Sequence, residues 1–215
     1  MKAKAIRIGL ALSIDIFSLQ APSAAGQASP QAGACAAKAA FVAPAIGASS
    51  TYEIRAKAGG QVVSILKRTV IAVKDGYITT RDTYEIPDLE RSPTTERVVT
   101  EWLGLFSSGV EAFGQKFEAE IQGLDPAKVN ALQVNTALSA SGRFQSSFKG
   151  DGASGGYKVK ITAKGCVPGS GARRFEVVET RGATTKTWER EIDFSRGLVL
   201  AERSKESGAS MVLKE

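Results

Sequence analysis

Hydrophobic and polar side chains alternate along the C-terminal part of the chain. From Tyr157 to Lys164 every odd position is apolar, and every even position is lysine or threonine. This period of two is that of a β-strand with one buried face and one solvated face. Similar segments, separated by turns rich in glycine and serine, follow at residues 173–180, 186–194, 198–203 and 209–213. Short strands at this spacing predict an antiparallel meander.

Strand patterns also fill much of the chain before residue 157. Asp75-Gly76 is a typical two-residue hairpin turn, and the segment before it is apolar on both faces, as in a strand near the centre of a sheet. We expect a turn or helical turn from Leu124 to Val134, and a flexible glycine-rich connection over residues 150–156. The further strands are predicted at residues 52–57, 61–74, 77–86, 115–121 and 136–149.

The period changes after Pro87. Apolar residues then recur at intervals of three and four, which is typical of a helix face. Ser92-Pro93 fits a helix start, whereas Gly104 and Gly109 argue against one long helix. We therefore predict a helix over about residues 93–107 that covers the sheet. Its stripe is also the candidate ligand-binding set, with core packing as the alternative: Val98, Trp102, Leu105, Phe106, Val110 and Phe113.

The first residues have the layout of a secretory signal. A basic start precedes an apolar run over residues 8–19, and the small residues Ser23-Ala24-Ala25 follow. A disordered or helical N-terminus is the alternative. The apolar run is shorter than a transmembrane helix requires, so we expect the chain not to span a membrane after cleavage. We expect a signal peptide at residues 1–25, a flexible leader at 26–49, and one antiparallel β domain at 50–215.

These patterns predict a mainly β fold, either an antiparallel curved sheet or an open β-barrel, with one short covering helix. Removal of Lys2, Lys4, Arg7 and Asp15 with the signal would lower the formal net charge from +6 to +4. The remaining basic residues are interspersed with acidic ones, so we expect no nucleic-acid partner. The location implied by a signal peptide is periplasmic or secreted.

The chain has two cysteines, Cys35 and Cys166. In an oxidising compartment an even number of cysteines favours a disulfide, and two unrelated thiols are the alternative. A bond between them would tie the mature N-terminus to a turn beside the C-terminal meander. Closing so long a loop would stabilise the fold by about 4 kcal/mol.

The residue types that usually carry catalysis are scarce. The chain has no histidine, which excludes Ser-His-Asp and Cys-His nucleophile pairs and imidazole metal ligands. Two distant cysteines do not make a zinc site, and no cofactor motif occurs. Glu189, Glu191 and Asp193 share one strand face and could serve acid–base work on a sugar. Because acids on a wet strand face are usually solubilising, we expect no enzymatic activity, no metal and no cofactor.

The run from Leu124 to the C-terminus resembles a family of exported, mostly β proteins of Gram-negative bacteria whose function is uncharacterised. The matching residues are Leu124-Asp125-Pro126, Val167-Pro168-Gly169, Phe175-Glu176-Val177-Val178 and Arg196-Gly197-Leu198-Val199. Asp193-Phe194-Ser195 departs from the aromatic-and-proline turn usual there. The resemblance implies a curved antiparallel sheet or open barrel in the periplasm, and it transfers no catalytic residue.

Two functions from different classes follow. The first is a non-enzymatic periplasmic protein that holds an apolar or amphipathic ligand, such as a lipid, between the sheet and the helix. The second is a structural or assembly partner of an envelope protein, acting through the exposed edge of the meander near Ser210 and Lys214. A third and weaker hypothesis is a hydrolase of cell-wall glycan that uses Glu189 and Glu191.

These expectations have a direct chemical test. Protein exported by its native host should begin near Gly26, and peptide mapping without reductant should find one peptide pair joined through Cys35 and Cys166. Reduction should separate that pair and lower the stability of the fold. An unprocessed N-terminus would contradict the export prediction, and two alkylatable thiols in the unreduced protein would contradict the disulfide.

Overall fold

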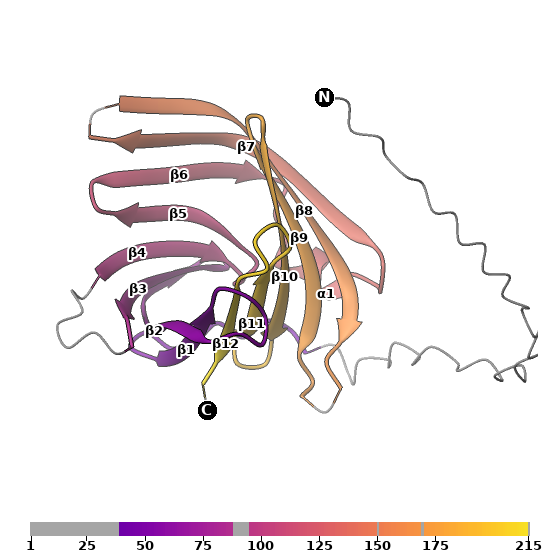
Figure 1. Ribbon diagram of the computed structural model, residues 1–215. Coiled ribbons are helices and arrows are strands. Elements are labelled where there is room, and N and C mark those ends of the chain that lie inside the picture. The colour runs from indigo at the N-terminus through magenta and orange to yellow at the C-terminus, as the bar shows by residue number, and fades with distance from the viewer. Residues whose placement is uncertain (1–38, 88–94, 150, 169, 215) are drawn as a thin grey trace, which may run out of the picture. The chain divides into compact units, whose positions relative to one another are not determined.

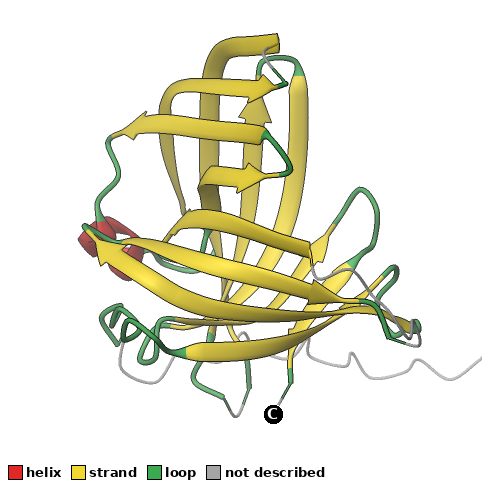
Figure 2. Ribbon diagram, turned by 90° about the vertical axis from the view of Figure 1, so that its left-hand side faces the viewer, coloured by secondary structure: helices red, strands yellow, loops and turns green. Residues whose placement is uncertain are grey.

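The computed structural model describes residues 39–87, 95–149, 151–168 and 170–214. Within them the chain folds as an antiparallel barrel of consecutive strands and one helix (Figures 1 and 2). The elements are β1 (Ser49–Arg55), β2 (Val62–Lys74), β3 (Tyr77–Glu85), β4 (Thr95–Trp102), β5 (Phe106–Ala112), β6 (Gln115–Gln122), α1 (Pro126–Ala131), β7 (Ala137–Phe148), β8 (Asp151–Cys166), β9 (Arg173–Arg181), β10 (Thr184–Asp193), β11 (Leu198–Ser204) and β12 (Ser210–Leu213).

Each strand pairs with its neighbours in sequence, and β1 pairs with β12 to close the barrel. The predicted antiparallel β class with one short helix is therefore confirmed, and the sheet is closed. The hairpin prediction at Asp75-Gly76 is also confirmed, because both residues have positive φ, 51° and 79°. Such values are required by the two-residue turn that matches the twist of paired strands.

The prediction of a helix over residues 93–107 is wrong. The described part of that range forms β4 and the start of β5, joined by a tight turn in which Leu103 and Gly104 have φ of 50° and 68°. Apolar residues crowd this turn because it is buried, and their spacing imitates a helix face. Val98, Val99 and Thr100 are β-branched, which favours a strand. Ser92-Pro93, the proposed helix start, lies outside the described residues.

The one helix among the described residues is α1, within the predicted helical turn from Leu124 to Val134. The Asp125 side chain caps it by accepting a hydrogen bond from the Ala127 backbone N–H at 2.9 Å. Pro126 begins the helix, where its missing N–H leaves no hydrogen bond unmade. No helix in the described ranges is both long and apolar enough to cross a membrane.

The prediction of a flexible connection at residues 150–156 is also wrong over its described part, because β8 already begins at Asp151, and Gly150 lies outside the described residues. Its first residues pair with β7 in register, from Asp151 opposite Phe148 to Gly156 opposite Arg143. Backbone hydrogen bonds need no side chain, so the small residues do not prevent pairing. Gly155 also makes room for an aromatic ring, since a Cβ there would lie 3.0 Å from the Phe144 ring.

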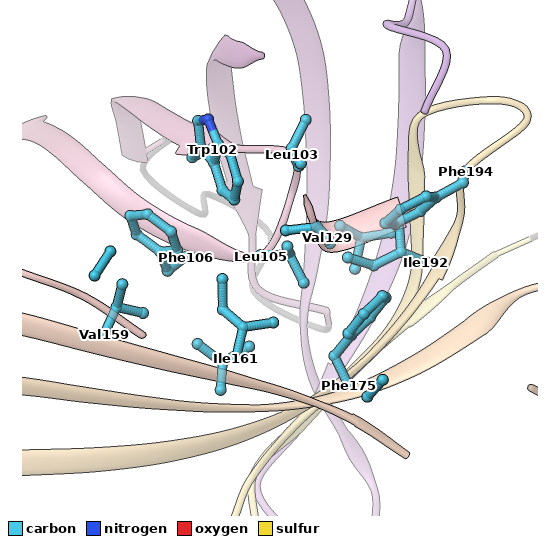
Figure 3. Close-up of a cluster of buried hydrophobic side chains, with 14 of the residues drawn as sticks. Trp102, Leu103, Leu105, Phe106, Val129, Val159, Ile161, Phe175, Ile192 and Phe194 are labelled. Atoms are coloured by element: carbon cyan, nitrogen blue, oxygen red, sulfur yellow. The ribbon is translucent and has the colours of Figure 1, made fainter. Parts of the chain in front are cut away.

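The core sits where the β4–β5 turn enters the barrel. Figure 3 shows Trp102, Leu103, Leu105 and Phe106 of this turn facing side chains from α1, β8, β9 and β10. Leu103, Leu105 and Phe106 are completely buried, and Trp102 is 1% exposed. The side chains that meet them are Val129, Val159, Ile161, Phe175, Ile192 and Phe194. A turn that usually lies in solvent therefore fills this end of the barrel.

The last residues of the predicted leader lie against the barrel. The Val42 N–H donates to the Phe194 carbonyl at 2.8 Å, and the ring of Phe41 packs edge-on against Phe194 with centroids 5.5 Å apart. Further along, the Gly47 N–H donates to the Val70 carbonyl at 2.8 Å. We call Phe41–Ala48 the strap, because it lies over the β10–β11 turn and β2.

Two glycines on neighbouring strands give a matched test of this packing. A Cβ on Gly142 of β7 would lie 1.7 Å from the backbone oxygen of Glu120, whereas a Cβ on Gly156 of β8 would meet nothing within 4 Å. Gly142→Ala should therefore lower the free energy of unfolding by about 3 kcal/mol, and Gly156→Ala should change it by less than about 0.5 kcal/mol. Urea unfolding measures both, and equal losses would contradict the register of β6 with β7.

Candidate functional site

Charged side chains occupy the inside of the barrel beside the apolar core. Arg68 comes from β2, Asp82 from β3, Glu101 from β4 and Arg190 from β10, and none is more than 8% exposed. We call these four residues the interior ion network. Buried ionic groups need partners, because transfer of an unpaired charge out of water is very costly. None of the four was predicted from the sequence to be buried.

Direct hydrogen bonds connect the network. Arg68 binds Asp82 with two parallel bonds, Nε to Oδ1 and Nη2 to Oδ2, each 3.0 Å long. Its Nη1 reaches Glu101 Oε2, also at 3.0 Å. On the opposite side Arg190 Nη1 donates to Glu101 Oε1 at 3.1 Å and to the Gly104 carbonyl at 2.7 Å. Arg190 therefore fixes both the carboxylate and the buried β4–β5 turn.

Neighbouring groups complete the pairing of charge. Arg97 lies 3.2 Å from Asp82 Oδ2, Thr80 donates to Asp82 Oδ1 at 2.9 Å, and Arg190 Nη2 pairs with Glu202. Burial by itself would raise the pKa of Glu101, but Arg68 and Arg190 lower it to about 2. Glu101 is therefore ionised at neutral pH and does not act as a proton donor. The arrangement is that of a structural clamp.

A small cavity of about 230 Å³ lies between the network and the strap. Its polar wall contains Tyr52, Arg68 and Glu101, and strap residues such as Pro44 form the opposite wall. The guanidinium group of Arg68 beside it is already bonded to the Asp82 and Glu101 carboxylates. The cavity is thus a narrow gap above the ion network.

A larger cleft opens on the inner face of the strands that stand away from the rest of the barrel. These strands are β5, β6, β7 and the first part of β8, and we call them the flap (Figures 1 and 2). The cleft, which we call the mouth cleft, has a volume of about 470 Å³. Its apolar lining contains Val110, Phe117, Phe144, Phe148 and Ala153, and Arg181 of β9 reaches it from one side.

Arg181 forms the polar wall of the mouth cleft. Its guanidinium stacks over the ring of Phe117, with 4.0 Å from carbon to centroid, and its Nη2 donates to Glu179 at 2.8 Å. Tyr157 donates to the same Glu179 oxygen at 3.0 Å. Burial and the neighbouring Glu179 raise the pKa of Tyr157 well above its ordinary value, so its hydroxyl stays protonated and donates. The result is an aromatic wall beside a paired cation.

The structure does not bring the six candidate ligand-binding residues together. Trp102, Leu105 and Phe106 belong to the core, and only Val110 lines the mouth cleft. Val98 is partly buried and neighbours Val99, which points inward, so it lies on the outer face of β4. Phe113 is 70% exposed at the β5–β6 turn. From the sequence, Phe144 and Phe148 are predicted as strand residues and not as binding residues.

The remaining predictions concern the acids of β10, a metal site and the disulfide. Among the three acids of β10, Glu191 accepts from Arg174 at 2.9 Å and Asp193 accepts from the Ser195 N–H at 3.0 Å. Glu189 lies 3.3 Å from Lys205. No group of histidine, cysteine or acidic side chains suited to a metal occurs in the described ranges. Cys35 lies outside them, so its pairing with Cys166 stays a prediction.

The exposed edge that was expected at the C-terminal meander is not present. Met211 of β12 pairs with Ile54 of β1 on one side and with Glu202 of β11 on the other. Because β12 is paired on both sides, Ser210 does not lie on an open edge. The edge hypothesis of the sequence analysis is therefore wrong at this strand.

No family model and no curated protein matches the chain. Two solved structures resemble it at low identity. A protein of Bacteroides fragilis, described as exported with a YmcC-like fold, is 12% identical, with 80% of this chain and 96% of that chain covered and a TM-score of 0.42. The hypothetical lipoprotein YmcC from Escherichia coli is 13% identical, with 79% and 88% covered and a TM-score of 0.42. Both matches are remote, and the chain's own residues decide what its site can bind.

The ion network predicts a specific acid dependence. The folded pKa of Glu101 is about 2 against an ordinary value of 4.5, so its stabilising contribution is complete above pH 4.5 and is lost as the pH falls towards 2. At neutral pH Glu101→Gln should destabilise the fold by roughly 3–5 kcal/mol, because it leaves buried arginines underpaired. It should also flatten the acid limb of stability against pH.

The control is Glu96→Gln. Glu96 pairs with Arg81 at 3.1 Å, but both side chains are more than half exposed. A surface pair of this kind contributes at most about 1 kcal/mol. Chemical unfolding between pH 2 and pH 7 compares the variants, and equal losses for both would contradict the clamp.

Proposed function

We propose that this chain is an exported, non-enzymatic protein that binds an apolar or amphipathic ligand in the mouth cleft. The observation that carries the proposal is the aromatic lining, formed by Phe117, Phe144 and Phe148 around a space of about 470 Å³. This volume is within the range of small-molecule sites. Phe148 is 43% exposed, so a ligand that covered it would remove apolar surface from water.

The two ends of the cleft suggest how an amphipathic molecule would lie. The apolar part would rest on the Phe117, Phe144 and Phe148 rings on the inner face of the flap. The polar part would lie near Arg181 or at the rim beside Lys116 and Asp151, which also border the cleft. Arg181 is paired with Glu179 and the rim carries both signs, so the site favours neither a strong anion nor a strong cation.

The proposal also includes the absence of enzymatic activity and a location in the periplasm or outside the cell. The chain contains no histidine, and the acids considered for glycan hydrolysis have partners on the outer surface. The secretory layout of residues 1–25 supports an address in the periplasm or outside the cell.

Two phenylalanines provide a matched test of the cleft. Phe148 lines the mouth cleft, whereas Phe113 lies at the β5–β6 turn, is 70% exposed and does not line it. Titration with the neutral fluorescent probe N-phenyl-1-naphthylamine should show saturable binding to the unmodified protein. Phe148→Ser should weaken this binding by about tenfold or more, since a lost apolar contact of 1.5–3 kcal/mol corresponds to such a factor. Phe113→Ser should leave the affinity within about twofold.

Neither substitution touches the buried core, so both variants should fold, and their circular-dichroism spectra should match that of the parent protein. Equal loss of probe binding in both variants would indicate binding at exposed aromatics in general. An unchanged affinity in Phe148→Ser would place the probe elsewhere. Either outcome would overturn the mouth cleft as the binding site.

A further inference from the structure

The first part of β8 has a neighbouring strand on only one side. Asp151–Gly156 pair with β7, but pairing of β8 with β9 begins only at Tyr157 opposite Arg181. Beyond that point the Gly182 N–H donates to the Gly156 carbonyl at 3.1 Å, and the chain then turns into β10. Among the described residues no strand lies against Asp151–Gly155 on the side away from β7. Figure 1 shows this segment as the outermost strand of the flap, and we call it the free edge.

The register fixes which backbone groups of the free edge point outwards. Because the Gly156 carbonyl points towards β9, the N–H and C=O of Ser154 and Gly152 point to the same side by the alternation of a strand. The backbone groups of Ala153 and Gly155 point towards β7 instead. Gly152 and Ser154 therefore present hydrogen-bonding groups in the spacing that a further β-strand would match.

The free edge has few of the features that usually protect such strands, and its one charged side chain is Asp151 at its end. Natural edges are blocked by lysine, by proline, by a bulge or by a covering segment. The segment Asp151-Gly152-Ala153-Ser154-Gly155 contains neither lysine nor proline, and its pairing with β7 has no register shift. Ala153 and Ser154 are exposed. Small side chains on both faces leave room for a neighbouring strand.

We infer that the free edge pairs with the same segment of a second copy of this chain, in an antiparallel and two-fold symmetric arrangement. With the two-fold axis at Ala153, Gly152 of one copy faces Ser154 of the other, so the outward backbone groups meet each other. Asp151 then faces Gly155 of the second copy, and the two carboxylates do not face each other. The arrangement is isologous, as in most symmetric dimers.

The length of the free edge also fits this partner. At one end β8 begins at Asp151, and at the other end the turn from β9 to β10 begins. The free edge of a second copy, in antiparallel orientation, has the length that fits between these two limits. A longer foreign strand would run into the β9–β10 turn. The pairing would join the two flaps and place two mouth clefts in one continuous sheet.

Proline at position 154 tests the pairing. Ser154→Pro removes the outward N–H, and proline is tolerated on edge strands when the missing N–H faces solvent. The bonds to β7 are kept because they come from Ala153 and Gly155. Ser154→Thr is the control, since it keeps the N–H. Sedimentation velocity over a wide range of concentration should show a reversible dimer for the unmodified protein and for Ser154→Thr, and only monomer for Ser154→Pro.

A cysteine at the proposed two-fold axis gives an independent readout. Residues in a non-hydrogen-bonded antiparallel pair have Cα atoms about 4.5 Å apart, which a disulfide can bridge. Mild oxidation of Ala153→Cys should therefore give a covalent dimer. Ser147→Cys on β7 should not, although Ser147 is also exposed and pairs with Gly152. The unmodified chain gives the background from Cys35 and Cys166.

Several results would overturn the inference. The unmodified protein could remain a monomer at every concentration while Ala153→Cys fails to cross-link. A dimer that persists in Ser154→Pro would place the interface elsewhere. A dimer lost in both Ser154→Pro and Ser154→Thr would show that the outward N–H of residue 154 does not hold the dimer together. A monomer whose free edge instead bound an added extended peptide would identify a different occupant.

Discussion

The fold depends on one carboxylate held between two arginines inside the barrel. Glu101 of β4 receives Arg68 from β2 on one side and Arg190 from β10 on the other. β2 and β4 are separated only by β3, whereas β10 lies on the opposite arc of the closed sheet. The ion network therefore crosses the barrel interior and fixes the distance between its walls. Because Arg190 also binds the Gly104 carbonyl, the same contact fixes the apolar turn that fills the core.

The interior of the barrel has two ends with different properties. At one end Trp102 and its neighbours in the β4–β5 turn exclude water completely. At the other end β5 to β8 stand away as the flap, where Phe148 remains partly exposed and the mouth cleft opens. Apolar surface that is left uncovered on a rigid frame is the arrangement that a binding site requires. The closed end supplies the stability, and the open end has the surface available for a ligand.

The sequence predicts most of the strands and fails where burial changes the meaning of a pattern. Alternation along residues 157–164 and the Asp75-Gly76 turn are local signals, and both are confirmed. The apolar spacing from Val98 to Phe113 wrongly suggests a helix. The turn of this hairpin is buried inside the barrel, so its apolar residues do not alternate with polar ones. Residues 150–156 wrongly suggest a loop. Glycine has no side chain, so a strand rich in glycine shows no alternation of apolar and polar residues.

The candidate site was less accessible to prediction than the fold. One signal for the ion network was available: Arg190 has the same strand parity as Ile192 and Phe194, so it had to point into the core. Its partner Glu101 lies 89 residues away in the sequence, and only closure of the barrel brings the two side chains together. The mouth cleft likewise combines Phe117, Phe144 and Phe148 with Arg181 from a separate strand. No local pattern contains that combination.

Native mass spectrometry of the protein purified without detergent from its own host tests the central claim most directly. If the mouth cleft binds an apolar or amphipathic molecule, the intact protein should carry excess mass that organic extraction removes, and the extract should contain one class of amphipathic compound. A protein that always shows the mass of the bare chain, and that takes up no such compound from a host extract, would contradict the account.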